Sequence, residues 1–301
     1  MAKVKIQNYI EPFVSPPVLQ KVFYLLILVS NSLLITLIHQ DTCLHTPMDF
    51  FISVLSMLNV CYTTTTVPQM LVHILSEKRA VSFARCVAQM YLFLLFGIAE
   101  SWLFSIMSVD RYVAICHPLR YKVIMNHWVC LLMVGICAAY GVVGGLCFTF
   151  FAMHLPYCGP NEIDYYFCEV PAVLKLACTD TSLNDLVDFI TGFNVIVVPL
   201  SLIVLVYVNI FATIMKIRSA QGRVKAFSTC ASHITVVTVF AVPCIVMYMS
   251  PGSDSWSNSS KKMAIFYNIA TAFLNPVIYS LRNKDVNRAF LKLVGRGRAP
   301  E

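Results

Sequence analysis

The feature that most constrains the fold of this chain is a series of seven long apolar segments, spread over almost all of its 301 residues. The segments lie at about 18–39, 49–75, 87–114, 127–152, 187–215, 226–250 and 262–281. Most exceed the roughly 20 residues that a helix needs to cross the hydrocarbon core of a bilayer. Barrel strands would alternate over about 10 residues, and helices satisfy their own backbone polar groups in lipid. The sequence therefore predicts an all-α membrane protein, a seven-transmembrane helix bundle that forms one domain over residues 1–301.

Composition and charge support this prediction and set the orientation. The chain is 58% hydrophobic and 12% charged, with a mean hydropathy of +0.73, whereas soluble domains carry about 25% charged residues. With the N-terminus outside, most Lys and Arg residues and the net charge of +7 lie on the cytosolic side. We therefore expect a multi-pass plasma membrane protein whose inner face suits anionic membrane lipid and an acidic partner. No nucleic-acid motif is present, so nucleic-acid binding is not expected.

Four cysteines would lie on the outer, oxidising side, where disulfides persist. They are Cys86, Cys158, Cys168 and Cys178. Four cysteines allow three pairings, and spacing alone does not choose among them. The other eight cysteines are interpreted as small buried apolar residues. The only N-x-S/T sequon is Asn258-Ser259-Ser260 in the last outer loop, so glycosylation is expected at Asn258.

The dipeptide Asp110-Arg111 stands where the third apolar segment meets a more polar stretch. One interpretation is an arginine that reaches the lipid headgroups. The other is a switch that is closed while Asp110 holds Arg111, because a charge at a membrane boundary is costly without a partner.

Three prolines interrupt the last three apolar segments, at Pro199, Pro243 and Pro276. Each removes a helix hydrogen bond, which produces either a static kink or a hinge. A ten-residue basic connector, 216–225, is expected between the fifth and sixth spans. Residues 283–294 alternate charged and apolar side chains, which favours an amphipathic helix on the inner leaflet.

Four motifs together resemble the signature set of olfactory receptors, which are rhodopsin-like G-protein-coupled receptors. They are L-H-T-P-M-D-F-F (44–51), D-R-Y-V-A-I-C-H-P-L-R-Y (110–121), K-A-F-S-T-C-A-S-H (225–233) and N-P-V-I-Y-S-L-R-N (275–283). The resemblance extends from about residue 31 to residue 290. It implies a receptor that binds a small volatile hydrophobic ligand and activates a stimulatory heterotrimeric G protein through the cAMP pathway, without a cofactor. It also implies the disulfides Cys86–Cys168 and Cys158–Cys178.

The resemblance assigns roles to three groups of residues. The residues implied for G-protein coupling and switching are Asp110, Arg111, Tyr112, Tyr207, Asn275, Pro276 and Tyr279. A polar core would be formed by Asn31, Asn59, Glu100, Ser101 and Asn275. The ligand pocket expected in the outer half of the bundle is lined by Phe93, Leu94, Gly97, Ile98, Thr191, Val195, Cys244, Met247, Tyr248 and Asn268. This lining is apolar and uncharged, which favours neutral ligands held by shape and one or two hydrogen bonds.

Several positions depart from the family pattern. Asn59 replaces an aspartate, so no metal site is assigned, and a sodium site at Asn59 and Glu100 is doubtful. Asp49 replaces a tyrosine, and Ala241 replaces an aromatic residue of the sixth span. The first segment is weak, because its apolar run is interrupted by polar residues from Ser30 onward.

Three other classes of protein remain as alternatives. A small membrane transporter would show inverted repeats and charged, unwound helices at mid-depth, and only Glu100 is charged there. A membrane enzyme would show a catalytic cluster, but the seven histidines are scattered. The third alternative is a poorly surfacing, signalling-impaired relic of a receptor, which the weak first helix and Ala241 favour.

Overall fold

The computed structural model describes residues 3–6, 17–75, 80–158, 162–163, 167–248, 269–280, 284–293 and 295. Within these residues six helices are long and apolar enough to cross a membrane, and a shorter apolar helix spans Ile269–Ser280. The prediction of an all-α membrane bundle is confirmed. The elements are β1 (Lys3–Ile6), α1 (Pro17–Gln40), η1 (Thr42–Leu44), α2 (Pro47–Leu75), β2 (Ala80–Ser82), α3 (Phe83–Cys116), η2 (Pro118–Arg120), α4 (Tyr121–Ile124), α5 (His127–Met153), β3 (Glu162–Ile163), α6 (Val170–Leu174), α7 (Ser182–Gly192), η3 (Phe193–Val197), α8 (Val198–Met215), α9 (Ala220–Tyr248) and α11 (Lys284–Leu293).

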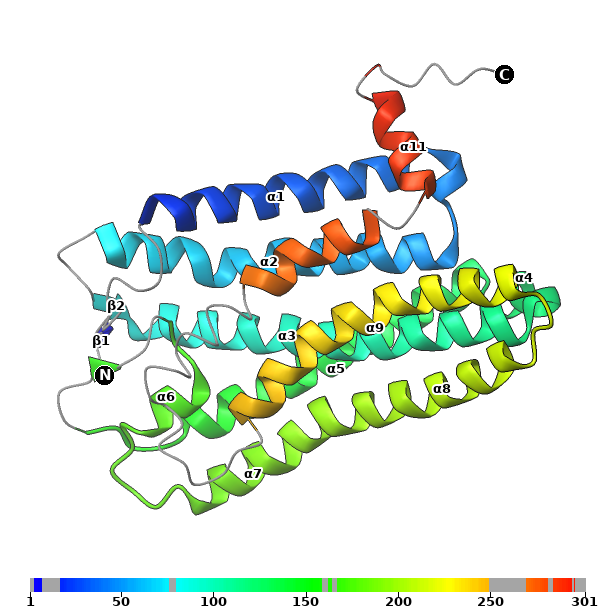
Figure 1. The fold of residues 1–301 in the computed structure, drawn as a ribbon. Coiled ribbons are helices and arrows are strands. Elements are labelled where there is room, and N and C mark those ends of the chain that lie inside the picture. Colours follow the sequence, from blue (N-terminus) through cyan, green and yellow to red (C-terminus); the bar gives the residue numbers. More distant parts are fainter. Residues whose placement is uncertain are drawn as a thin grey trace.

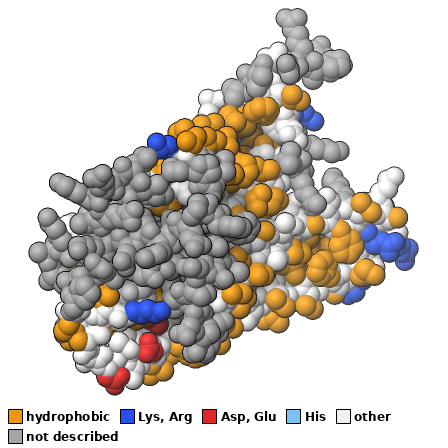
Figure 2. Space-filling model, turned by 60° about the vertical axis from the view of Figure 1, so that its left-hand side comes forward, with side chains coloured by type: hydrophobic (Ala, Val, Ile, Leu, Met, Phe, Trp, Pro, Cys, Tyr) orange, Lys and Arg blue, Asp and Glu red, His pale blue; other side chains and the backbone are white. Residues whose placement is uncertain are grey.

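The helices run side by side along one long axis (Figure 1). One end carries the N-terminus, the short strands and α6, and the other carries α4 and α11. Figure 2 shows hydrophobic side chains along the described helix surfaces, acidic side chains near one end and a group of Lys and Arg side chains at the opposite end. This charge distribution fits the predicted orientation, with the N-terminus outside and the basic end in the cytosol.

Helix ends follow local capping chemistry. The Ser82 side chain accepts a hydrogen bond from the Arg85 backbone N–H at the start of α3, and the Asn126 side chain does the same for Val129 at the start of α5. Each cap satisfies one of the backbone donors that a helix N-terminus leaves unpaired. Asp49 belongs to the same class of interaction, because its backbone N–H donates to the Thr46 hydroxyl and its carboxylate accepts from that hydroxyl. The Thr46 hydroxyl therefore caps α2, and the Asp49 side chain in the first turn accepts a hydrogen bond from this cap.

The first helix agrees with its expected bounds, whereas the sixth begins earlier than expected. The first apolar segment was expected to be weak, yet α1 spans 24 residues. Its outer end includes Gln20, which is polar but buried. The sixth helix begins at Ala220, so most of the expected connector 216–225 is helical, and only Lys216–Ser219 separates α8 from α9. Hydropathy predicted only the apolar part of this helix, which lies in lipid. The same helix begins earlier, in polar turns on the cytosolic side.

The fifth span consists of α7, the π-helical turn η3 and α8 in direct succession. Pro199 follows this π turn closely and has no backbone N–H, so the carbonyl of Val195 four residues earlier loses its usual helical donor. The Ser101 hydroxyl of α3 donates to that carbonyl at 2.6 Å. A proline or an inserted side chain commonly makes a helix irregular, and both are present at this π turn.

A three-stranded sheet lies at the outer end, and no strand was expected there. β1 pairs antiparallel with β2, where Val4 faces Val81, and parallel with β3, where Lys5 faces Glu162. β1 is the central strand of the sheet. The sheet therefore joins the N-terminal segment, the α2–α3 connection and the loop after α5.

At the inner end α11 is strongly amphipathic, as predicted. Val286 and Ala289 are buried, whereas Phe290 and Leu291 are exposed. Lys292 of α11 forms an ion pair with Asp41 at 3.2 Å, beside the short helix η1. The helix is therefore fastened to the end of α1.

Candidate ligand cavity and cytoplasmic switch

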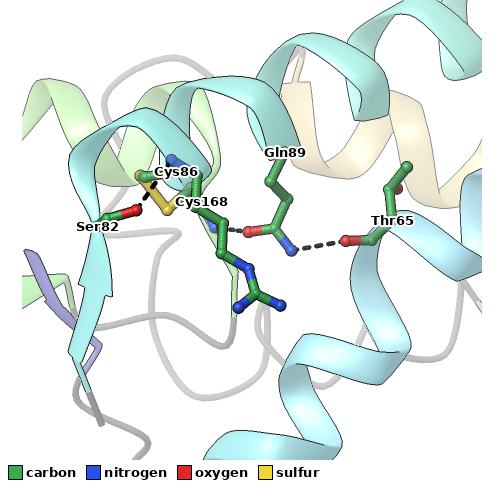
Figure 3. Close-up of a disulfide and its surroundings, with 6 residues drawn as sticks. Thr65, Ser82, Cys86, Gln89 and Cys168 are labelled. Carbon is green, nitrogen blue, oxygen red and sulfur yellow. Dashed lines mark hydrogen bonds between the residues drawn. A yellow bond between two sulfur atoms is a disulfide. The ribbon is translucent and has the colours of Figure 1, made fainter.

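The outer loop is fastened over the bundle by two disulfides. Cys86 at the top of α3 is joined to Cys168, and Cys158 is joined to Cys178. Beside the first bridge, the buried side chain of Gln89 accepts a hydrogen bond from the Cys168 backbone N–H at 3.1 Å and donates to the Thr65 carbonyl at 2.8 Å (Figure 3). Gln89 thus links the loop to α2 as well as to α3, and sequence reasoning did not identify it.

Beneath this loop lies a cavity of about 80 Å³. Its lining comes from α2, α3, α5, the fifth span and α9, and comprises Tyr62, Phe93, Leu94, Gly97, Ile98, Ser101, Phe148, Gly192, Val195, Ile196, Phe240 and Cys244. No lining residue carries a charge. The wall therefore offers an apolar surface with a few hydrogen-bonding groups, which is typical of sites for small organic ligands.

Six of the ten residues expected to bind ligand line this cavity. They are Phe93, Leu94, Gly97, Ile98, Val195 and Cys244. Thr191 does not line it, and its hydroxyl donates to the Val187 carbonyl within its own helix at 2.7 Å. Ala241 is buried in the core but is also not part of the lining. Asn268 lies outside the described residues, as do the side chains of Met247 and Tyr248 and the whole of the sequon at Asn258.

A chain of buried amides lies deeper in the bundle. Asn31 donates to the Ala272 carbonyl at 3.0 Å, and Asn59 donates to the Asn31 side-chain oxygen at 3.3 Å. Asn275 donates to Asn59 at 3.4 Å and to Glu100 at 3.5 Å. Four of the five residues expected to form a polar core are therefore together, which agrees with the tendency of polar side chains inside membrane bundles to face one another. Ser101 is the exception, because its hydroxyl is bonded to the Val195 carbonyl.

At the cytosolic end of α3, Asp110 holds Arg111. The Asp110 carboxylate accepts a hydrogen bond from the guanidinium of Arg111 at 2.8 Å and a second one from the Tyr121 hydroxyl at 2.7 Å. Asp110 is fully buried. Burial and the neighbouring Asp110 carboxylate raise the pKa of Tyr121, so this phenol stays protonated and continues to donate. Tyr121, which belongs to α4, is a partner that sequence reasoning missed.

Above Arg111, the tyrosines of two other helices point to the same buried region. Tyr207 of α8 shares a hydrogen bond of 2.8 Å with His233 of α9. Within the part of the chain that the structure describes, the buried Tyr279 hydroxyl and Nε of Arg111 have no hydrogen-bond partner. Such groups are costly to leave unpaired. His233 was not assigned a role from the sequence, although it ends the motif K-A-F-S-T-C-A-S-H.

The remaining switch residues have structural surroundings of their own. The Tyr112 ring packs edge-on against His117, with ring centres 5.6 Å apart. Pro276 is buried, as is Asn275, which belongs to the amide chain. Among the described residues, no group of three His, Cys, Asp or Glu side chains is placed to hold a metal ion.

Comparison with known proteins gives a single family. Residues 20–296 match the family model described as olfactory receptor. The human olfactory receptor 2T10 is 47% identical over 270 residues, which cover 90% of this chain and 86% of that protein. Human olfactory receptor 2D2 is 44% identical over 273 residues, covering 91% of this chain and 88% of the relative. Human olfactory receptor 2G3 is 43% identical over 272 residues, covering 90% and 88%.

Proposed function

The chain belongs to the olfactory receptor family, and we propose that it binds a small, neutral, hydrophobic, volatile odorant in the cavity beneath the outer loop. Bound odorant activates a stimulatory heterotrimeric G protein and raises cAMP. As a family member with six membrane-length helices among its described residues, it is a multi-pass protein of the plasma membrane and a receptor rather than an enzyme.

The observation that carries this proposal is the uncharged cavity of about 80 Å³ next to α3. Pockets for drug-sized ligands usually measure roughly 300–1,000 Å³. A cavity of this size therefore suits a small volatile molecule, and a larger odorant requires side chains to move. The Ser101 hydroxyl lies in the wall, where a ligand that donates a hydrogen bond would compete with it for the Val195 carbonyl.

Helix α3 connects this cavity to the cytosolic end. It carries Gly97 and Ser101 at the cavity, Glu100 in the amide chain, and Asp110 and Arg111 at the cytosolic end. A ligand that moves α3 relative to the fifth span would therefore act on both ends of one rigid element. A bound ligand shifts the equilibrium only if it binds one arrangement more tightly than the other.

The test is a panel of odorants applied to cells that express the receptor, with cAMP and surface labelling as readouts. In the variant Gly97→Ala, the added methyl group would meet the Tyr62 ring at 3.5 Å, which is ordinary contact. This variant should reach the surface like the parent and respond to a shorter range of ligand lengths. The control is Gly135→Ala, because a methyl group there has nothing within 4 Å.

Each outcome of this test has a definite meaning. Identical ligand-length profiles for parent, Gly97→Ala and Gly135→Ala would place the ligand elsewhere. Normal surface labelling with no cAMP response to any odorant would favour the signalling-impaired relic over an active receptor.

A further inference from the structure

A groove of about 920 Å³ lies at the cytosolic end of the bundle, far from the odorant cavity. It is bounded by α1, η1 and α2 on one side and by α4 and the first turns of α5 on the other. Its volume lies in the range of roughly 300–1,000 Å³ that is typical of sites for small organic molecules. Neither the ligand cavity nor the Asp110–Arg111 pair accounts for it.

The groove has an apolar floor and a polar rim. The floor includes Ile38, Leu44, Met125 and Cys130, all of them buried. The outer wall includes Met57, whose side chain is 53% exposed on the lipid-facing side of α2. Met57 lies well inside the apolar span Pro47–Val72, so this wall of the groove extends toward the depth of acyl chains. The groove is therefore built for an amphiphile whose apolar part lies in the bilayer.

The rim lies at the membrane boundary and favours an anion. The exposed basic and histidine side chains of the rim are those of His39, His45, Lys122 and His127, beside the exposed polar residues Thr42, Thr46 and Asn126, and none of the described residues that line the groove is acidic. Lysine supplies a positive charge, and histidine supplies a hydrogen-bond donor in either tautomer. Basic pockets between transmembrane helices on the cytosolic side are typical binding sites for acidic lipid headgroups.

Asp41 and Asp49, which neighbour groove-lining residues in the sequence, have partners of their own. Asp49 is occupied in the cap of α2 with Thr46. The Cys43 backbone N–H and Lys292 hold the pKa of Asp41 below its usual value. Both carboxylates have hydrogen-bond or ion-pair partners other than Lys122, so Lys122 on the opposite wall remains available to a ligand.

We propose that this groove binds an anionic phospholipid of the inner leaflet, with an acyl chain on the floor and the phosphate at Lys122. Tyr121 lines the same groove, and its hydroxyl holds Asp110, the carboxylate that pairs with Arg111. A lipid that packs on Tyr121 therefore stabilises the closed Asp110–Arg111 pair. This inference deepens the proposed function, because it adds an inner-leaflet regulator of the same switch.

The binding test uses the full-length receptor in nanodiscs of phosphatidylcholine with or without phosphatidylserine, followed by native mass spectrometry of retained lipid. Lys122→Gln removes the rim charge and should lower phosphatidylserine retention about fivefold, the equivalent of one basic contact near the surface. Met57→Trp narrows the groove and should lower retention of the acyl chain. Lys216→Gln, an exposed cytosolic lysine outside the groove, is the matched control and should retain the parent level.

Equal retention of phosphatidylcholine and phosphatidylserine, or displacement of both by cholesterol, would overturn the headgroup assignment. A Lys122→Gln variant that retains as much phosphatidylserine as Lys216→Gln would also overturn the headgroup assignment.

Coupling to the switch is measured without reference to signalling, by hydrogen–deuterium exchange of residues 117–126. Phosphatidylserine should slow exchange there in the parent and not in Lys122→Gln, and unchanged exchange in both would refute the coupling. Neither lipid retention nor hydrogen–deuterium exchange needs an odorant or a G protein. If the receptor failed to signal, the proposed function would be contradicted, but these two measurements would still decide whether the lipid site exists.

Discussion

At Gly141, α5 lies so close to α3 that one added methyl group would test the contact between the two helices. A Cβ atom built at this position would lie 2.5 Å from the backbone oxygen of Leu95 and 3.3 Å from the Cβ of Ala99. Ordinary van der Waals contact begins at 3.4 Å. Leu95 presents a backbone atom, so the helices themselves must separate. Small residues at helix interfaces are what allow such close approach in membranes.

The expected cost of Gly141→Ala follows from this geometry. Overpacking a closely packed interior costs about 1–3 kcal/mol. By contrast, Gly135→Ala on the same helix meets nothing within 4 Å and should gain about 0.5–1 kcal/mol, because alanine orders a helix more readily than glycine. Gly141→Ala has the same propensity gain, so the two variants should differ by the overpacking cost of about 1–3 kcal/mol, which changes the ratio of unfolded to folded protein by about fivefold to about 150-fold.

The assay is thermal unfolding of the purified receptor, followed with a thiol-reactive fluorescent dye. Cys130 and Cys137 are free and buried on α5, so they report the opening of this helix. Gly144→Ala provides an intermediate case, because its methyl group would meet the end of the flexible Ile98 side chain at 2.8 Å. The expected order of stability is Gly135→Ala, then Gly144→Ala, then Gly141→Ala. If Gly141→Ala proved as stable as Gly135→Ala, the α3–α5 contact described above would be wrong.

Three further predictions concern single polar side chains. Arg111→Ala should reach the surface, since its neighbouring carboxylate keeps the hydrogen bond from Tyr121, but should give no odorant-dependent cAMP; normal signalling would remove Arg111 from the switch. Gln89→Ala removes the tie to the Thr65 carbonyl and leaves the buried Cys168 backbone N–H unpaired at a cost of about 1–3 kcal/mol, so surface labelling should fall below that of the exposed control Gln221→Ala, and equal levels would contradict the bridge in Figure 3. Ser101→Ala should lower the unfolding temperature, because the Val195 carbonyl, which Pro199 leaves without its helical donor, then also loses the Ser101 hydroxyl. Ser101→Thr keeps a hydroxyl and should restore the unfolding temperature of the parent. A Thr variant that unfolds at the temperature of the Ala variant would count against this hydrogen bond.

The sequence predicted the membrane bundle because burial in lipid imposes a long apolar run on every span. The same reasoning placed the start of the sixth helix at 226, whereas the helix begins at Ala220. Hydropathy reports where lipid lies, and the six extra residues are helical without being apolar. The small outer sheet was not predicted, because its strands are only two to four residues long and pair with segments that are distant in the sequence.

The candidate site was predictable where several functional residues share one helix. Phe93, Leu94, Gly97 and Ile98 follow helical spacing on α3, and all four line the cavity. What could not be predicted depends on neighbouring helices. The family resemblance assigned Ser101 to the polar core, but Pro199 on another helix removes the helical donor of the Val195 carbonyl, and the Ser101 hydroxyl binds there instead.

The partners of the switch show the same limit. Tyr121 lies eleven residues beyond Asp110, across the end of α3 and a short 3₁₀ turn. His233 meets Tyr207 across two helices. No periodicity in the chain connects such pairs, and only the three-dimensional arrangement reveals them.

The outer sheet has a consequence for the order in which the receptor assembles during synthesis. β1 is the first described segment to leave the ribosome, but β2 follows two membrane spans and β3 follows four. The N-terminal strand must therefore wait, already translocated and without partners, while most of the helices are made and inserted. Pairings between residues so far apart in sequence form late, because loop closure must come first. The strand that lies at the centre of the outer sheet is thus made first and ordered last, and until then it remains open to the enzymes and chaperones of the compartment it enters.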